Sequence, residues 1–204
     1  MIWLTWRQFR GQAATTSSAL AAARIEELGL DRRRRAGKLS GGQRAQLALT
    51  LAVAKRPELL ILDEPVASLD PLARREFLHE LSEAVAEHEF SVVLSSHLVS
   101  DLERVCDHLI VLNHGRVTLT GDIDTLLAEH RLLVGPRTAT DLDRAGAVVE
   151  AVHSDRHTTL LVRDGALPPA PGWQAQPVAL EDLVLAYLRR PSEPSAAVTS
   201  GVAA

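Results

Sequence analysis

The strongest constraint on the fold of this chain is a run of four large aliphatic residues that two acidic residues follow directly. Residues 59–62 read Leu-Leu-Ile-Leu, Pro57 lies just before them, and Asp63, Glu64 and Pro65 follow directly. A short apolar run between turn signals predicts a strand that is buried on both faces, as in a parallel sheet. The two carboxylates would then lie at the C-terminal edge of that sheet, where open α/β sheets bind their ligands.

The segments after this run alternate between the patterns of helices and strands. Pro71 predicts a helix from a cap at Asp70 to about residue 87, and residues 90–95 predict a second buried strand. A short helix is expected over 98–105, a strand over 109–112, and a hairpin from the turn at 113–115 into 116–120. This order predicts a doubly wound α/β layer.

Two helices are predicted before the apolar run. Ser18 and Gly29 are the expected start and stop signals of a helix over 19–28. A second helix is expected from about residue 42 to residue 54, with Leu47, Leu51 and Ala54 on one face.

The first sixteen residues differ in composition from the rest of the chain. Trp3, Trp6 and Phe9 are three of the seven aromatic residues of the protein. Their spacing of three predicts one face of a helix, beside Arg7 and Arg10. Three interpretations stay open here: an interfacial membrane helix, a core helix, or a foreign leader.

The pattern changes again after about residue 130. Short strands are expected over 131–134, 147–153 and 158–162, with a turn at 154–156, and a loop rich in proline follows at 168–172. A helix is predicted over 180–189. This part is therefore expected to form a small α+β appendage, and residues 191–204 are rich in Pro, Ser and Ala and are expected to be disordered.

Composition excludes several classes of function. The net charge is −4 and the pI is about 6.1, so the electrostatic balance does not favour a nucleic-acid partner. Cys106 is the single cysteine, which excludes an internal disulfide and a cysteine-based zinc site. The sequence has no apolar run of about 18 residues, so no membrane-spanning helix is expected. The basic run Arg32–Arg35 predicts a solvated loop, and contact with nucleotide or anionic lipid is the alternative.

The segment Ser40-Gly41-Gly42-Gln43 opens the second predicted helix. A helix N-terminus leaves backbone N–H groups unpaired and carries partial positive charge, so it attracts anions. Glycines let a phosphate approach the backbone, and the Ser40 hydroxyl adds a donor. The alternative is that Ser40 only caps the helix before two flexible glycines.

Several motifs in this order resemble those of the ATP-binding cassette (ABC) ATPases, the energy-coupling subunits of membrane transporters. They are Leu39-Ser40-Gly41-Gly42-Gln43, Leu59-Leu60-Ile61-Leu62-Asp63-Glu64-Pro65, Ser68-Leu69-Asp70 and Ser96-His97. The resemblance covers about residues 18–190. It implies a partial P-loop NTPase-type α/β fold, a parallel sheet with helices, followed by the small appendage. In drug-export-type members, a motif like Glu181-Asp182-Leu183 recurs near the end of that appendage.

The resemblance also implies roles for particular residues. Ser40, Gly41, Gly42 and Gln43 would bind the γ-phosphate of ATP held on the opposite subunit of a dimer. Asp63 resembles the carboxylate that holds Mg²⁺ through its water shell, and Glu64 resembles the base that orients the attacking water. His97 resembles the histidine that contacts the γ-phosphate. Asp70 matches a loop that communicates across the dimer; the alternative is that it caps the next helix, and both roles can hold at once. The implied cofactors are ATP and Mg²⁺, and the implied partners are a membrane permease and a second ATPase subunit. The expected location is cytoplasmic, peripheral to the inner face of the cell membrane.

A phosphate loop reads Gly, four residues, Gly-Lys, then Ser or Thr, and the printed sequence contains no such segment. Gly37-Lys38 is the only Gly-Lys pair, with Arg32 in place of the first glycine and Leu39 in place of the Ser or Thr.

The expected organisation is a leader over 1–17 that resembles a permease start, a partial ATPase domain over 18–130, an accessory domain over 131–190 and a tail over 191–204. We expect the strand over residues 59–62 to leave an open apolar edge of the sheet. We therefore also expect poor solubility, or dependence on a partner.

Three interpretations follow for function. The first is an ATP-hydrolysing transporter subunit, of an export system, that lacks its own phosphate loop. The second is a non-catalytic partner that donates its signature helix to a complete subunit, and the third is an inactive gene remnant. A DNA-repair or chromosome-structure ATPase is disfavoured, because no long heptad coiled coil is present.

Overall fold

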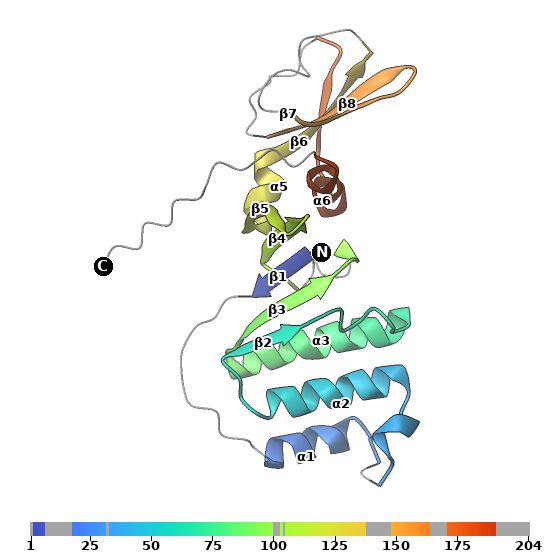
Figure 1. Cartoon of the computed structure of the whole chain (residues 1–204), viewed down its shortest axis with the longest axis vertical. Coiled ribbons are helices and arrows are strands. Elements are labelled where there is room, and N and C mark those ends of the chain that lie inside the picture. The colour runs from blue at the N-terminus through green and yellow to red at the C-terminus, as the bar shows by residue number, and fades with distance from the viewer. Residues whose placement is uncertain are drawn as a thin grey trace, which may run out of the picture. The chain divides into compact units, whose positions relative to one another are not determined.

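The computed structural model describes residues 2–6, 18–31, 33–99, 103, 105–137, 148–163 and 171–190. The chain divides into two compact units, Met1–Ile110 with Gly121–Ile123, and Val111–Thr120 with Asp124–Ala204 (Figure 1). The division falls near residue 110, earlier than the boundary near residue 130 that the sequence suggests. The hairpin of β4 (His108–Asn113) and β5 (Arg116–Asp122) contributes residues to both units.

The sheet of the first unit contains β2 (Leu59–Leu62) and β3 (Ser91–Ser96) as parallel neighbours. Leu59 is in register with Ser91 and Leu62 with Leu94, so both strands end at the same edge. On the other side of β3 lies β1 (Ile2–Trp6), which is antiparallel and pairs Trp6 with Val92. The helix expected from the spacing of Trp3 and Trp6 is therefore wrong for residues 2–6. Backbone pairing with a buried strand outweighs a spacing signal of so few residues.

Three helices accompany this sheet: α1 (Ser18–Glu27), α2 (Gly41–Val53) and α3 (Pro71–His88). They lie in a row with α2 between α1 and α3 (Figure 1). Gly29, with a φ of 62°, follows α1 at the predicted stop, and a short 3₁₀ helix (Ala36–Lys38) precedes α2. The three helix predictions are confirmed within one or two residues.

The buried face of α2 differs from the expected one. Leu49, Thr50 and Val53 are buried, whereas Leu51 is 48% exposed. Of the expected face, Ala54 is 2% exposed and is confirmed, whereas Leu51 is wrong, because α2 packs against a helix on each side and these two neighbours decide which residues are covered.

Strand β2 is less covered than its apolar sequence predicts. Leu59 is 47% exposed and Ile61 is 60% exposed, so the expectation of burial on both faces is wrong. Within the described part of the chain β2 is the end strand of its sheet, as expected for the open apolar edge.

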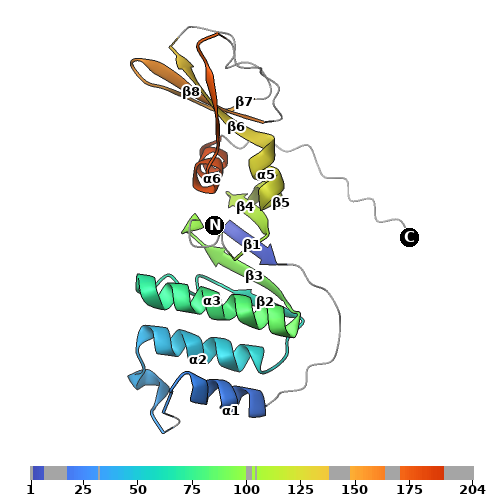
Figure 2. The same cartoon turned by 180° about the vertical axis from the view of Figure 1, so that it is seen from behind.

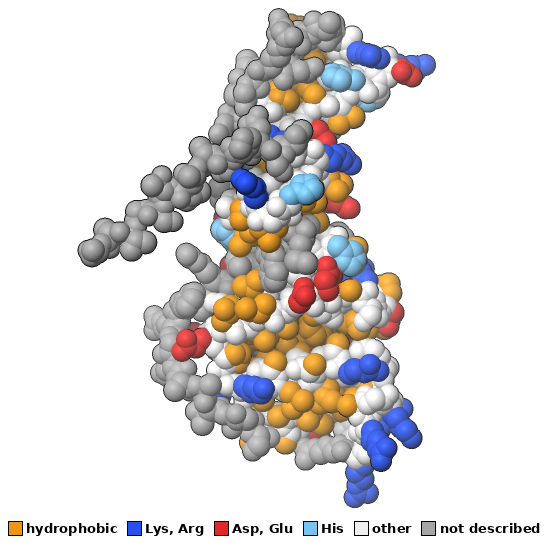
Figure 3. All heavy atoms as spheres, viewed as in Figure 1, with side chains coloured by type: hydrophobic (Ala, Val, Ile, Leu, Met, Phe, Trp, Pro, Cys, Tyr) orange, Lys and Arg blue, Asp and Glu red, His pale blue; other side chains and the backbone are white. Residues whose placement is uncertain are grey.

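Hydrophobic side chains gather on the face of the first unit seen in Figure 3, and Lys and Arg side chains gather at the loop between α1 and α2.

The second unit is an α+β structure, as predicted. Its four-stranded antiparallel sheet has the order β7 (Val148–His153), β8 (His157–Arg163), β6 (His130–Pro136) and β9 (Gln174–Pro177). Helices α5 (Ile123–Glu129) and α6 (Leu180–Arg189) complete it (Figure 2). Helix α5 and strand β9 were not predicted, because each is short and β9 has no apolar alternation.

Turn chemistry explains the hairpin between β4 and β5. His114 and Gly115 have φ values of 49° and 75°, as a two-residue turn of type I′ requires. The helix expected over 98–105 and the loop at 168–172 lie partly outside the described residues, and the tail at 191–204 lies wholly outside them.

The core of the second unit forms around β6 and β8. Leu133, Leu160 and Val162 are buried together, and Trp173 packs against them. Gly135 is necessary here, because a Cβ atom at that position would lie 2.1 Å from the Trp173 ring. His130 is also buried, and its Nε2 lies 2.9 Å from the Tyr187 hydroxyl of α6.

Candidate active site

Parallel strands β2 and β3 bring four polar residues to one edge of the first unit's sheet. Asp63 and Glu64 follow β2 directly, Ser95 lies at the end of β3, and His97 follows β3. The in-register pairing of the two strands explains why residues more than thirty positions apart meet here. We call these residues, Asp63, Glu64, Ser95 and His97, the strand-end cluster.

The buried hydroxyl of Ser95 links the two acids. Ser95 has no exposed surface, and its Oγ donates to Asp63 Oδ1 at 2.5 Å. The same Oγ accepts the backbone N–H of Glu64 at 2.8 Å. One hydroxyl therefore holds both the Asp63 carboxylate and the turn after β2. Sequence reasoning named this serine only as part of a strand, and a hydroxyl near the end of a buried apolar strand was the available signal.

Glu64 has a left-handed backbone with a φ of 46°. This conformation costs free energy in a residue with a side chain, and such strain is often concentrated at functional sites. The turn aims the Glu64 carboxylate at His97, so that Oε2 lies 2.9 Å from the imidazole Nδ1. The Glu64 side chain is 33% exposed and that of His97 is 62% exposed, so both groups are open to solvent.

A carboxylate beside an imidazole can perform proton-transfer chemistry. With a neutral imidazole, the Nδ1–H donates to Glu64 and fixes the rotamer of the carboxylate, and with a charged imidazole the contact is an ion pair. A carboxylate held in this way can accept a proton from a water molecule within hydrogen-bond reach. The sequence nominated Glu64 and His97 separately, and the structure brings them together.

The start of α2 is organised by its own side chains. Ser40 Oγ accepts the Gln43 backbone N–H at 3.1 Å, and Gln43 Oε1 accepts the Ser40 N–H at 3.1 Å. This reciprocal pair is a capping box, which satisfies two of the backbone donors of the helix start. Ser40 is exposed, so its hydroxyl remains accessible from solvent. The capping alternative for Ser40 is confirmed, and its role toward phosphate stays a prediction.

One of the two glycines at this helix start, Gly42, has a packing reason that the sequence did not reveal. A Cβ atom at Gly42 would lie 2.9 Å from the Cβ of Ala73 on α3, which is closer than such atoms approach in proteins. A Cβ atom at Gly41 would lie 3.8 Å from Leu69 Cδ2, an ordinary contact. Gly42 therefore allows the close approach of α2 and α3, whatever else the glycines do.

Asp70 caps the next helix. Its Oδ1 accepts the backbone N–H groups of Leu72 and Ala73, each at 3.0 Å, ahead of Pro71 at the first helical position. The capping role predicted for Asp70 is confirmed, and a role in communication across a dimer stays a prediction.

Asp63 is the candidate ligand for Mg²⁺. In the described ranges, no group of three or more His, Cys, Asp or Glu side chains could hold a metal ion. Mg²⁺ accepts oxygen ligands and often takes only one or two carboxylates, with water and substrate phosphates as the rest. The exposed carboxylate of Asp63, held by the Ser95 hydroxyl, fits that chemistry, provided that phosphate oxygens come from a bound nucleotide. Gly37-Lys38, the only Gly-Lys pair, lies in the short 3₁₀ helix before α2 and not in a phosphate loop.

The thiol of Cys106 is expected to be unreactive. Desolvation by burial, with a smaller effect from Asp107, raises the pKa of its thiol to about 12. The group is therefore a neutral thiol near pH 7.

Comparison with known proteins finds similarity over part of the chain. Residues 4–67 match the family model described as ABC transporter. The chain is 36% identical over 126 residues to the phosphonates import ATP-binding protein PhnC of Burkholderia pseudomallei (strain 1710b), over 61% of this chain and 41% of that protein. It is 40% identical over 96 residues to the Nod factor export ATP-binding protein I of Rhizobium sp. (strain N33), over 47% of this chain and 31% of that protein.

A solved structure of an ATP-binding subunit of an ABC transporter has 31% identity and a TM-score of 0.46, over 55% of this chain and 49% of that one. Over part of its length, this chain is therefore similar to the ATP-binding proteins of ABC transporters. It spans less than half the length of the two curated relatives.

The family match begins at residue 4, inside the stretch 1–17 that the sequence predicts to be a leader. Within the described part of the chain, no helix combines the length and the apolar character needed to cross a membrane.

Proposed function

We propose that this chain contributes the signature helix and the hydrolytic residues of an ATP-binding subunit of an ABC transporter. The observation that supports this proposal is the strand-end cluster, in which the Glu64 carboxylate meets His97 at 2.9 Å beside the Asp63–Ser95 pair. The cluster lies at the carboxyl edge of two parallel strands, where ligands of open α/β sheets bind.

The four residues of the cluster have complementary chemistry for phosphoryl transfer. Asp63, oriented by Ser95, would hold Mg²⁺, which when bound neutralises charge on phosphate oxygens. Glu64 would orient and deprotonate the attacking water, and His97 would both fix that carboxylate and face the γ-phosphate.

The start of α2 would act on a second subunit. Ser40 is exposed and already positioned by its bond with Gln43, so the helix start is preorganised for an anion. In this proposal Ser40 and Gly41 approach ATP held by the partner ATPase. Asp70 would carry the signal between subunits. It follows Leu69, whose Cδ2 would lie 3.8 Å from a Cβ atom placed at Gly41.

Tight binding of ATP needs contacts that the printed sequence does not supply. A phosphate loop provides several charge-assisted hydrogen bonds, each worth about 1.5–3 kcal/mol. We therefore expect the printed chain alone to bind ATP weakly, and to work with a partner ATPase and a membrane permease at the cytoplasmic face of the membrane.

Donation of the signature helix without hydrolysis is the second candidate function, favoured by the exposed and fully capped Ser40. An inactive gene remnant stays the third interpretation.

The direction of transport is a separate proposal. The residues Glu181-Asp182-Leu183 in α6 favour an export system by resemblance. Relatives named for import of phosphonates and of molybdenum match at 36% identity, and one named for Nod factor export matches at 40%, so the names of the relatives do not support the export direction.

Nucleotide binding and hydrolysis test the proposal. The full chain is measured alone and mixed with a complete homologous ATPase subunit, using labelled ATP and release of phosphate. We expect weak binding alone and a change in the partner's rate on mixing, which Ser40→Arg removes. Glu64→Gln should abolish only the share of hydrolysis that this chain contributes. No effect of the chain on any partner would overturn the proposal, and micromolar ATP binding by the chain alone would overturn the expected dependence on a partner.

A further inference from the structure

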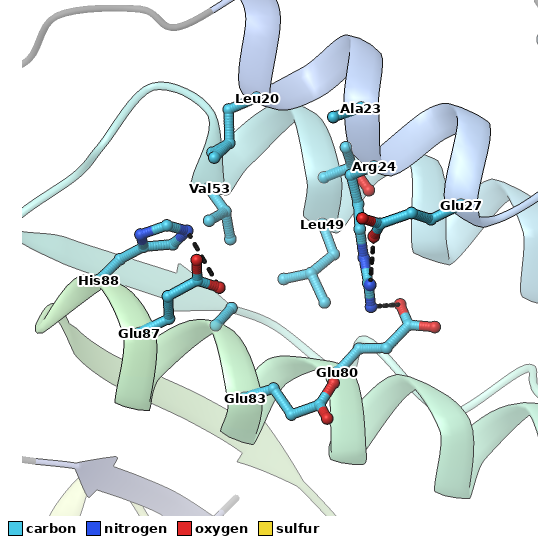
Figure 4. Close-up of a pocket in the computed structure, with 12 residues that line it drawn as sticks. Leu20, Ala23, Arg24, Glu27, Leu49, Val53, Glu80, Glu83, Glu87 and His88 are labelled. Carbon is cyan, nitrogen blue, oxygen red and sulfur yellow. Dashed lines mark hydrogen bonds and ion pairs between the residues drawn. The ribbon is translucent and has the colours of Figure 1, made fainter.

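A groove over α2, between α1 and α3, is not explained by ATP chemistry. It encloses about 160 Å³, and Figure 4 shows its lining residues. Leu49 and Val53 of α2 form part of its floor, with Leu20 of α1 and Ala84 of α3 beside them. All of these residues belong to the first unit. Since drug-sized ligands occupy pockets of about 300–1,000 Å³, this volume suits one large apolar side chain better than a whole small molecule.

The rim of the groove is acidic at both ends, and its one arginine, Arg24, pairs with the carboxylates at one end. At the first end, Arg24 lies between two carboxylates, 2.9 Å from Glu27 and 3.9 Å from Glu80. Gln46 also donates to Glu80 at 2.9 Å, and burial raises the pKa of this carboxyl. These groups form a local network that needs no external ligand.

The second end, where α3 finishes, has an excess of negative charge. Glu83 lies 3.4 Å from His79, and Glu87 lies 3.9 Å from His88, the last residue of the helix. Both carboxylates are more than half exposed, and a histidine balances a carboxylate only when it is protonated. The C-terminus of a helix adds partial negative charge at the same place. An apolar floor beside this charge favours an occupant with one large apolar side chain and a cation next to it.

We propose that the groove between α1 and α3 is a docking site for a basic amphipathic helix of a partner protein. The leucine-like side chain of that helix fills the floor over Leu49 and Val53, and its Arg or Lys groups face Glu83 and Glu87. The acidic rim repels the same groove of a second copy, and it also repels an anionic lipid surface. The proposal does not depend on the function of the strand-end cluster.

Binding of a defined peptide tests this site. The probe is a fluorescein-labelled synthetic helix that carries leucines one turn apart on one face and arginines beside them. Its fluorescence anisotropy is followed with the full chain at about 0.15 M ionic strength, so that distant charges are screened. One control peptide replaces each arginine by glutamate, and another replaces each leucine by serine. We expect the first peptide to bind and both control peptides to fail.

Two variants on α3 separate the charge from the shape of the groove. The double change Glu83→Lys with Glu87→Lys should weaken binding of the basic peptide by about tenfold or more and allow the glutamate peptide to bind. Ala84→Phe fills the floor and should also weaken binding by about tenfold, with the charge unchanged. Glu58→Lys makes the same kind of charge change at an exposed position outside the groove, and it should leave binding within about twofold.

Circular dichroism of each variant checks that the helices remain folded. The proposal is overturned if wild type does not bind the basic peptide, if the serine peptide binds equally well, or if neither groove variant weakens binding. Self-association of the chain that the Glu83 and Glu87 changes remove would also overturn it, because the occupant would then be a second copy.

Discussion

The helix start at Ser40 and the strand-end cluster hold their polar groups in different ways. Ser40 and Gln43 bind each other across three positions of one helix. The cluster instead joins Ser95 to Asp63 and His97 to Glu64, across more than thirty positions of the chain. The first arrangement needs only local sequence, whereas the second exists only when β2 and β3 pair in the correct register. Substitutions in the two regions should therefore affect stability to different extents.

The largest effect is expected at Ser95. Ser95→Ala leaves the partly buried N–H of Glu64 and the Asp63 carboxylate without their shared partner, at a cost of about 1–3 kcal/mol of unfolding free energy. Urea unfolding measures this cost. Ser96→Ala is the matched control, because Ser96 accepts one bond from the Leu98 N–H and should cost less. An equal cost at both serines would remove the distinction between them.

Gly42 comes next, because its role depends on a neighbouring helix. Gly42→Ala places a methyl group 2.9 Å from Ala73 Cβ, and such overpacking costs about 1–3 kcal/mol, partly offset by the better helix propensity of alanine. Thermal unfolding should show a lower midpoint for Gly42→Ala and no loss for Gly41→Ala. The double change Gly42→Ala with Ala73→Gly should recover most of the packing cost. A failure of this rescue would mean that the contact with α3 is not the cause.

Ser40→Ala tests the local arrangement. Loss of the capping box should cost about 1 kcal/mol, because one helix N–H loses its acceptor. Urea unfolding again measures the difference, and Ser40→Asp, which retains a capping oxygen, should restore most of the stability. If Ser40→Ala proves more destabilising than Ser95→Ala, the contrast between the two regions is wrong.

The smallest expected change is a gain. Glu64 has a φ of 46°, and glycine adopts this conformation without strain, so Glu64→Gly should stabilise the chain by about 0.5–1 kcal/mol. The same change removes the carboxylate that faces His97. Unfolding measurements on Glu64→Gly and Glu64→Gln separate the two effects, since only glycine relieves the backbone strain. A loss of stability in Glu64→Gly would show that the carboxylate, not the backbone, dominates at this position.

Much of the first unit is predictable from short segments. Capping residues and breakers such as Ser40, Asp70 and Gly29 have local effects, so the limits of the three helices follow from the sequence. The secondary structure at Trp3 and Trp6 is not predictable in this way, because strand β1 depends on pairing with β3 far along the chain. The exposure of Ile61 has a similar cause, since an apolar run does not reveal whether a neighbouring strand will cover it.

By itself, the sequence of this protein determined the limits of α1, α2 and α3, those of β2 and β3, the hairpin turn and the order of the ABC-type motifs, because each depends on residues close together in the chain. Only the tertiary structure decided that Ser95 joins Asp63 to the Glu64 backbone, that Glu64 meets His97, and that Gly42 is required by Ala73. The physical reason is that these contacts join distant segments, so they depend on strand register and helix packing rather than on local conformational preference.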